Sequence, residues 1–519
     1  MKGKIFFVLF SLFIIHINSS DTAAQPVGKM KDEPHRPQIH FSPKAHWMND
    51  PNGMVYNNGI YHLFFQYYPD STVWGPMHWG HATSKDLIHW KEQPIALYPD
   101  SLGCIFSGSA VVDKNNTSGF GKNGKAPLVA IFTHHDFVGE KAGTNTFQNQ
   151  SIAYSNDEGK TWIKYAGNPV IKNPGIRDFR DPKVMWYQPQ KKWVMILATK
   201  DRVTFYSSLN LKAWKKESEF GEDAGAHGGV WECPDLFALD DNVRLNDQVG
   251  QGKKVWVLTV SINPGAPNKG SATQYFVGDF DGEKFKPIST DTKWIDCGTD
   301  NYAGVTWSNT GNRKIYLGWM SNWMYAKQVP TETWRNAMTI PRELKIKHVG
   351  NDIFVASEPV KELSKIQLKP VVAENIQLTK TIDLAKKAGA IKSPCRINLS
   401  FEKANNFSLS VANDMGEEIV IGYNKKQNQY FIDRTKSGKA DFEKGFAARH
   451  VAPRVTNNSK MNISLVIDVS SVELFADDGL TVMTEIFFPN KPYNQINIQS
   501  TDGSALKRLE YINMSSIWK

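Results

Sequence analysis

Short apolar stretches recur along most of the chain and are separated by Gly, Asn, Asp and Pro. Examples are YHLFF at 61–65, LVAIF at 128–132, WVMIL at 193–197 and VWVL at 255–258. Helical periodicity is scarce between them. Strands bounded by turn residues at short intervals are typical of all-β proteins, so the pattern predicts a propeller, a barrel or a sandwich.

A weak internal repeat favours the propeller. The segments SKDLIHW (84–90), SNDEGKTW (155–162) and SSLNLKAW (207–214) each follow an apolar strand and close a polar turn with Trp, and GDFDGEKF (278–285) is a degenerate copy. Propeller blades repeat such a unit because each sheet buries its faces against its neighbours. The copies are unevenly spaced, so coincidental hairpins remain the alternative.

The character of the chain changes near residue 355. Beyond about Thr379 the alternating strands are longer, as in RINLSF (396–401), and SVELFADDG (471–479) reads as a strand that enters a tight turn. We therefore expect a propeller over 35–355, a connecting segment over 356–372 and a β-sandwich of mainly structural role over 373–519.

Composition is compatible with two large domains, since the chain has 519 residues of which 41% are hydrophobic. The formal net charge is +9, but Lys and Arg are spread along the chain, which argues against nucleic-acid binding. The four cysteines lie far apart and lack metal-ligand spacing. We expect them to be free, buried thiols.

The first 24 residues read as a secretory signal. Lys2 and Lys4 precede an apolar run from Ile5 to Ile17, and a small-residue stretch ends at Ala24, the expected cleavage point. The run is too short to span a bilayer, which takes about 20 residues. The sequence thus predicts export to the periplasm or the medium, without a membrane anchor; it does not indicate the oligomeric state.

Three carboxylates stand out by their context. Asp50 lies in WMNDPNG, where Pro and Gly predict a turn. Asp181 lies in FRDP, where Arg180 is expected to favour the ionised form. Glu232 lies in WECPDLF, whose apolar residues predict a desolvated carboxyl suited to a general acid. Singly, each is more often a turn or ion-pair residue.

Together, and in this order, the motifs resemble those of glycoside hydrolase family 32, the invertase, inulinase and levanase family. Further matches are WGPMHWGHA (74–82), FSGSA (106–110) and WRNAMTIPREL (334–344), so the resemblance covers nearly the whole mature chain. It implies a five-bladed β-propeller followed by a C-terminal β-sandwich, and a fructan or fructo-oligosaccharide as substrate.

The resemblance also implies catalytic roles. Asp50 would attack the anomeric carbon of a fructosyl unit, and Glu232 would protonate the leaving oxygen and then activate water. Asp181 would hold sugar hydroxyls and stabilise the oxocarbenium-like transition state. Such double displacement retains configuration and places the two reacting carboxyls about 5–5.5 Å apart. No metal or organic cofactor is implied.

Other matched positions imply contacts with substrate. Those expected to line the pocket for the terminal fructose are Asn49, Gln66, Trp74, Phe106, Ser107 and Arg180. Trp47 and Trp334 are expected as stacking walls and Asp300 as a ligand of sugar hydroxyls, although Asn301 replaces the family's usual aromatic residue. Cys233 either tunes the neighbouring acid through its thiol or is a small buried residue.

Several functions stay open at this point. The leading hypothesis is an exo-acting fructan β-fructosidase that also splits sucrose, and its close rivals are an endo-levanase and a fructosyltransferase. A non-catalytic carbohydrate-binding propeller would need the aromatic residues but not the three carboxylates. An inverting five-bladed hydrolase of arabinan or xylan would place its carboxyls about 6.5–9.5 Å apart.

Overall fold

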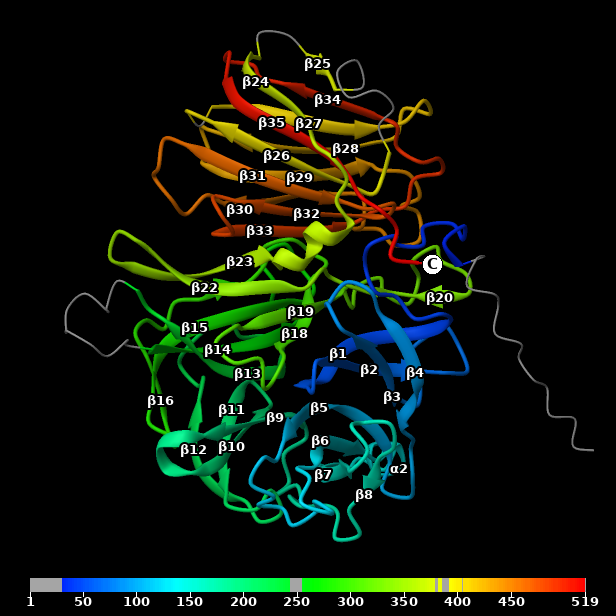
Figure 1. Ribbon diagram of the computed structural model, residues 1–519, viewed down its shortest axis with the longest axis vertical. Helices are drawn as coiled ribbons and strands as arrows, with labels where there is room; N and C mark the ends of the chain where they lie inside the picture. Colours follow the sequence, from blue (N-terminus) through cyan, green and yellow to red (C-terminus); the bar gives the residue numbers. More distant parts are fainter. Residues whose placement is uncertain (1–29, 243–253, 379–380, 385–391, 404, 519) are drawn as a thin grey trace, which may run out of the picture.

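The computed structural model of the protein describes residues 30–242, 254–378, 381–384, 392–403 and 405–518 (Figure 1). The predicted signal at 1–24 lies outside the described residues. Within them, no helix has both the length and the apolar character needed to cross a bilayer. The described helices are short: α2 (Phe137–Lys141), η1 (Gln188–Gln190) and η3 (Lys361–Ile366).

Five sheets form the lower body in Figure 1. The first contains β1 (His46–Asn57), β2 (Ile60–Tyr68), β3 (His78–Ser84), β4 (Lys91–Leu97) and, parallel to β1, β20 (Trp334–Arg335). The second contains β5 (Cys104–Val112), β6 (Leu128–His135), β7 (Gln148–Ser155) and β8 (Ile163–Lys164). The third contains β9 (Phe179–Tyr187), β10 (Lys192–Thr199), β11 (Arg202–Ser208) and β12 (Lys215–Phe220).

The remaining two sheets continue the same antiparallel order. The fourth contains β13 (Val230–Asp240), β14 (Lys254–Asn263), β15 (Ala272–Phe280), β16 (Phe285–Pro287) and β17 (Lys293–Trp294). The fifth contains β18 (Tyr302–Thr306), β19 (Ile315–Met320), β21 (Ala337–Met338), β22 (Arg342–Val349) and β23 (Asp352–Pro359). β23 thus continues into the segment predicted as a connection.

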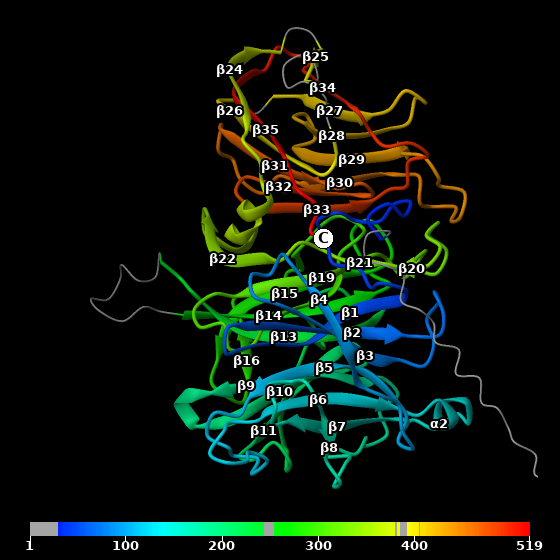
Figure 2. The same cartoon turned by 45° about the vertical axis from the view of Figure 1, so that its right-hand side comes forward.

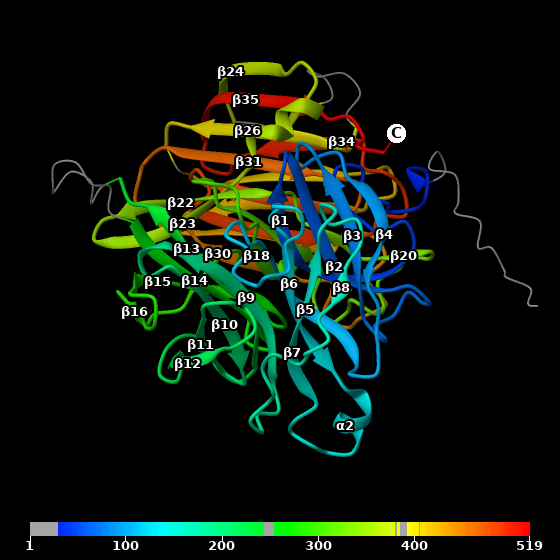
Figure 3. The same ribbon diagram turned by 60° about the horizontal axis from the view of Figure 1, so that its bottom comes forward.

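The first strand of each sheet lies at the centre of the body. β1, β5, β9, β13 and β18 contact one another in succession, and β18 contacts β1, so the ring closes (Figure 3). The sheets are therefore the five blades of a propeller. The predicted repeat is explained, because its copies begin at the ends of the third strands β3, β7 and β11, and the degenerate copy joins β15 to β16.

Two six-stranded sheets form the upper body (Figure 2). The first contains β24 (Val371–Gln377), β35 (Ala505–Asn513), β26 (Cys395–Phe401), β31 (Met461–Ile467), β32 (Ser471–Ala476) and β33 (Thr481–Ile486). The second contains β25 (Ile382–Asp383), β34 (Gln495–Gln499), β27 (Phe407–Ala412), β28 (Glu418–Asn424), β29 (Gln429–Lys436) and β30 (Arg449–Pro453). One apolar cluster joins them, as in a sandwich.

The predicted fold class is confirmed by this architecture. The predicted tight turn is also confirmed: Asp477, Asp478 and Gly479 have φ of 49°, 56° and 82° between β32 and β33. All four cysteines are free, as expected; Cys104, Cys233 and Cys395 are buried, whereas Cys297 is half-buried. β33 faces the propeller, since the amides of Cys297 and Asp300 donate to the carbonyls of Val482 and Thr484.

Candidate active site

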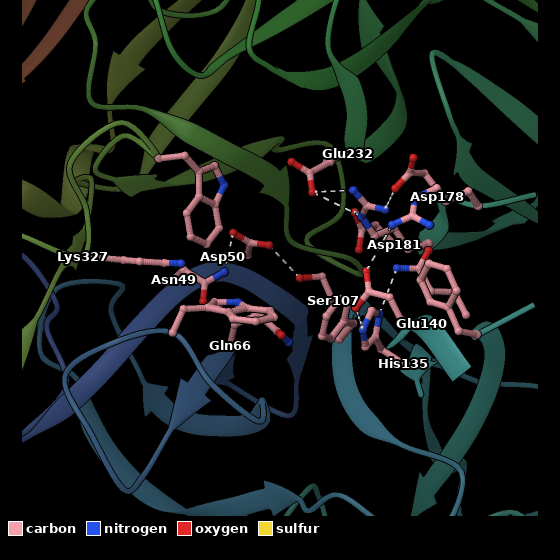
Figure 4. Close-up of a pocket in the computed structure, with 17 residues that line it drawn as sticks. Asn49, Asp50, Gln66, Ser107, His135, Glu140, Asp178, Asp181, Glu232 and Lys327 are labelled. Carbon is pink, nitrogen blue, oxygen red and sulfur yellow. Dashed lines mark hydrogen bonds and ion pairs between the residues drawn. The ribbon is translucent and has the colours of Figure 1, made fainter. Parts of the chain in front are cut away.

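A cavity of about 320 Å³ opens at one end of the propeller channel (Figure 4). The predicted residues that line it are Asn49, Asp50, Gln66, Trp74, Phe106, Ser107, Arg180, Asp181 and Glu232. They come from blades one to four, so the fold brings together motifs that are far apart in sequence. Among the described residues, no group of three or more His, Cys, Asp or Glu side chains is arranged to hold a metal ion.

The central strands are irregular where they reach this cavity. Strand pairing shifts register near Asp50 on β1, Ser107 on β5, Asp181 on β9, Glu232 on β13 and Ala303 on β18. Such bulges re-aim side chains and free backbone groups from the ladder. Pro follows Asp50, Asp181 and Cys233, and Pro has no N–H to lose at a bulge. Asp181, Cys233 and Ala303 also have positive φ, at 64°, 46° and 53°.

Asp50 does not lie in a turn, as its motif predicts, but inside β1. The turn-forming residues Pro51 and Gly53 instead accompany register shifts in that strand. Asn49 Nδ2 donates to Asp50 Oδ1 at 2.9 Å, and Ser107 Oγ donates to Oδ2 at 2.9 Å. Burial, and then the charge of Glu232, raise the pKa of Asp50, while both hydrogen bonds oppose the rise. The donors therefore favour the carboxylate that a nucleophile needs.

Asp181 differs from expectation in its ionisation. Burial raises the pKa of its carboxyl to about 7, and this outweighs the opposing charge of Arg180, whose Nε lies 3.9 Å away. The backbone N–H of Cys233 donates to Asp181 Oδ2 at 3.0 Å. The Cys233 thiol lies 3.6 Å from Asp50 Oδ2 and 3.7 Å from Asp181 Oδ2, so it contacts these two carboxylates. Of the two interpretations of Cys233, the small buried residue agrees with its burial, and the contacts of its thiol are with Asp50 and Asp181.

Glu232, whose neighbours in sequence predict a desolvated carboxyl, contacts two polar side chains in the structure. Arg180 donates to its Oε1 from Nε at 3.2 Å and from Nη2 at 3.0 Å. The hydroxyl of Tyr302 donates to Oε2. Arg180 is itself held by Asp178, whose Oδ1 accepts from Nη1 at 2.6 Å. Arg180 thereby fixes one oxygen of the carboxyl and Tyr302 the other.

Three predicted substrate residues lie outside the cavity lining. Trp47 is fully buried and donates from Nε1 to Asn49 Oδ1 at 2.7 Å, so it supports a lining residue. Trp334 is buried beneath the guanidinium of Arg36, 4.4 Å from the ring centroid. Asp300 is fully buried and ion-paired with Arg434 of the sandwich at 2.8 Å. Both aromatic rings are buried against other parts of the chain and neither lines the cavity, so stacking of a sugar on them stays a prediction.

The sequence interpretation also missed part of the lining. The residues concerned are His135, Glu140, Phe147, Gln148, Arg177, Asp178, Trp323 and Lys327. Arg177 and Asp178 immediately precede FRDP, a proximity that could have indicated them. Glu140, on the short helix α2, and Lys327, between β19 and β20, lie in segments without a chemical motif. Only the packing of blades and loops places them here.

Two family models cover the chain. The one described as the glycosyl hydrolases family 32 N-terminal domain matches residues 40–357, and the one described as the family's C-terminal domain matches residues 362–516. The first contains Asp50, Asp181 and Glu232. The part of the chain with the cavity and the part with the sandwich therefore match the two domains of one family.

Individual relatives agree with the family models. A levanase of Bacillus subtilis is 46% identical, over 98% of this chain and 74% of its own length. An extracellular exo-inulinase of Aspergillus niger is 41% identical, over 94% of this chain and 96% of its own. The crystal structure of an exo-inulinase from Aspergillus awamori superposes with a TM-score of 0.84 at 38% identity, covering 94% of this chain and 99% of that one. This chain belongs to glycosyl hydrolase family 32 and is a glycosidase.

Proposed function

We propose that the protein is a retaining β-fructofuranosidase that releases fructose from the ends of levan- or inulin-type fructans and from sucrose. The observation that carries the proposal is the convergence of Asp50, Asp181 and Glu232 on one cavity, with two donors aimed at Asp50. The names of the levanase and exo-inulinase relatives support a fructan as substrate.

The chemistry follows from the contacts. Asp50, held by Asn49 and Ser107, attacks the anomeric carbon, while Glu232 protonates the departing oxygen. The covalent fructosyl ester is then hydrolysed by a water that Glu232 deprotonates. Asp181 accepts hydrogen bonds from sugar hydroxyls. Carboxylate charge beside the developing oxocarbenium ion stabilises it most in a buried site, where water screens least.

Exo action is supported by relatives that are described as exo-inulinases. Below Asp181, the ammonium of Lys183 contacts Asp235 Oδ2 at 3.0 Å and the carbonyl oxygen of Thr306. This group links β9, β13 and β18 at the centre of the propeller and forms the floor of the channel. We assign the terminal fructose to the space between Gln66, Trp74 and Phe106, with Asn49, Ser107 and Arg180 as polar contacts.

The test is a time course of products from levan, inulin and sucrose. Fructose alone from the outset supports exo attack, whereas a ladder of oligosaccharides supports the endo-levanase. Fructosylated sugars in place of free fructose support the transferase. Release of β-fructose before mutarotation, followed by NMR, supports retention, whereas the α-anomer would mean inversion. Absence of hydrolysis of all three sugars would overturn the proposal.

We also propose that the protein is exported, with catalysis in the propeller at 35–355 and a supporting sandwich at 373–519. Six relatives are described as extracellular exo-inulinases, and the N-terminal pattern from Lys2 to Ala24 supports the same fate. N-terminal sequencing of protein from the periplasm and the medium tests it. A chain that still begins with Met1 inside the cytoplasm would contradict it.

A further inference from the structure

A buried group of three side chains crosses the boundary between sandwich and propeller. Arg434 lies on β29 in the sandwich, whereas Asp300 and Tyr325 lie in the propeller part of the chain. Nη1 of Arg434 is 2.8 Å from Asp300 Oδ2, Nη2 donates to the Tyr325 hydroxyl at 3.1 Å, and that hydroxyl donates to Asp300 Oδ1 at 2.6 Å. The three groups therefore form a closed triangle of contacts.

Arg434 is held rigidly from the sandwich side. Its Nε donates to the carbonyl of Phe446 at 2.7 Å, and Nη1 donates to the carbonyl of Ile486 at 3.1 Å. Glu485 Oε2 lies 2.8 Å from Nη1. The guanidinium is fully buried and planar, so these partners fix both its position and its orientation.

Tyr325 connects the triangle to one wall of the cavity, which is formed by Trp323 and Lys327. Tyr325 lies in the segment between β19 and β20 that also carries Trp323 and Lys327, two lining residues. The carbonyl of Tyr325 accepts from the amides of Gln328 and Val329, at 2.8 and 3.2 Å, so its position sets the fold of this segment. Fixing Tyr325 therefore fixes the wall.

That wall in turn reaches Asp50. Trp323 stacks on Trp47, with ring centroids 6.0 Å apart and planes inclined by 24°. Trp47 donates to Asn49, and Asn49 donates to Asp50. Asp300 connects the triangle to Glu232 more directly, because it lies two residues before Tyr302, whose hydroxyl donates to Glu232. Both reacting carboxyls are thus supported by chains of contacts that begin at Arg434.

We propose that Arg434 is a positioning residue through which the sandwich sets the geometry of the active site, by holding Asp300 and Tyr325. The inference rests on the proposed roles of Asp50 and Glu232. The sandwich, which the sequence predicts to be mainly structural, then contributes to catalysis. It also gives Asp300 a role, because its carboxylate receives the sandwich arginine in place of a sugar.

The sandwich offers a matched control with the same chemistry. Arg454, Asp477 and Tyr430 form a second buried triangle: Arg454 Nε is 2.8 Å from Asp477 Oδ2 and 3.2 Å from the Tyr430 hydroxyl, which donates to Asp477 at 2.7 Å. All three residues belong to the sandwich. Removing the arginine of either triangle leaves a buried carboxylate without its ion pair, so both arginine variants should lower thermal stability.

The experiment compares Arg434→Met with Arg454→Met, and Tyr325→Phe with Tyr430→Phe. Thermal unfolding is measured first, and kcat and KM for sucrose and for inulin are then measured well below every midpoint. We expect Arg434→Met and Tyr325→Phe to lower kcat/KM by roughly tenfold or more, because misplacement of about 1 Å costs up to about a hundredfold. KM should rise as well, because the displaced segment carries the lining residues Trp323 and Lys327. The two control variants should stay within about twofold of the wild type, since their triangle is remote from the cavity.

The rise in KM separates positioning from stability, because a smaller folded fraction lowers apparent kcat and leaves KM unchanged. Wild-type-like KM in both Arg434→Met and Tyr325→Phe would overturn the proposal, as would equal kinetic losses in the control pair. If Arg434→Met does not fold, the tyrosine pair decides. Failure of the wild type to hydrolyse levan as well as these two sugars would instead refute the proposed function.

Discussion

The hydroxyl of Ser107 donates a hydrogen bond of 2.9 Å to Oδ2 of Asp50, joining β5 to β1 at the cavity proposed as the active site. Burial and the neighbouring Glu232 both favour the protonated form of Asp50, which cannot act as a nucleophile. In the proposed mechanism the contact therefore has a kinetic as well as a structural role. It offsets part of the cost of keeping a carboxylate in a buried, acidic site.

Ser107→Ala should accordingly lower kcat/KM and shift the acid limb of the pH profile of kcat/KM. A hydrogen bond to a charged group contributes about 1.5 kcal/mol or more, which corresponds to roughly tenfold in rate. Removing a donor to the carboxylate raises the pKa of Asp50 further, so the acid limb of the pH profile should shift to higher pH. A profile measured from acid to neutral pH checks this; an unchanged limb would contradict the role of Ser107.

Glu232→Gln separates acid catalysis from nucleophilic attack. With sucrose we expect a loss on the order of 10²–10⁴ in kcat, because general acid assistance of the leaving oxygen disappears. A fructosyl fluoride needs no such protonation, so its first step should be largely retained. Asp50→Asn is the control and should lose both reactions, since no covalent intermediate can form. Equal losses of Glu232→Gln on both substrates would refute the assignment of the acid.

Asp181→Asn should stabilise the protein while reducing its activity. The pKa of Asp181 is raised to about 7 in the folded protein, so the folded state binds this proton more tightly than the unfolded chain. Ionisation of Asp181 therefore lowers the free energy of unfolding as the pH rises from about 4 to 7. The whole of this loss of stability is present at pH 8. We expect the variant to melt about 2 °C or more higher at pH 8, with little change at pH 4. A lower midpoint at pH 8 would contradict the direction of the shift.

Trp47→Phe distinguishes a sugar-stacking wall from a supporting residue. Trp47 is buried and donates to Asn49, which donates to Asp50, so loss of the indole N–H should lower kcat more than it raises KM. Trp334→Phe is the control, because Trp334 is buried beneath Arg36 and does not line the cavity. A selective rise in KM for Trp47→Phe would restore the stacking interpretation.

Lys183→Met tests the floor of the channel. The ammonium is buried against Asp235, and breaking a buried ion pair from one side costs about 3–5 kcal/mol. Thr306 still donates to Asp235 through its amide and its hydroxyl, so Asn at position 235 keeps an acceptor for them. The double variant Lys183→Met/Asp235→Asn should recover most of the lost stability in chemical denaturation. No recovery would show that Lys183 acts through packing alone.

Much of the architecture follows from the sequence by itself. Alternating strands with polar turns that close on Trp90, Trp162 and Trp214 determine the hairpin unit, because each blade must bury both faces against its neighbours. The order of the motifs, through its resemblance to family 32, predicts that Asp50, Asp181 and Glu232 share one site, and the three line one cavity. Local turn chemistry also determines the β32–β33 turn, where Asp477, Asp478 and Gly479 tolerate positive φ.

Only the tertiary structure decides how those residues are used. The prolines after Asp50, Asp181 and Cys233 suggest turns locally, yet the ring of central strands turns each site into a bulge inside a strand. The ionisation of Asp181 depends on burial, which outweighs the adjacent Arg180. Asp300 meets Arg434 from 134 residues further along the chain. Burial, bulges and contacts across domains depend on how distant segments pack, and no local pattern of residues encodes that packing.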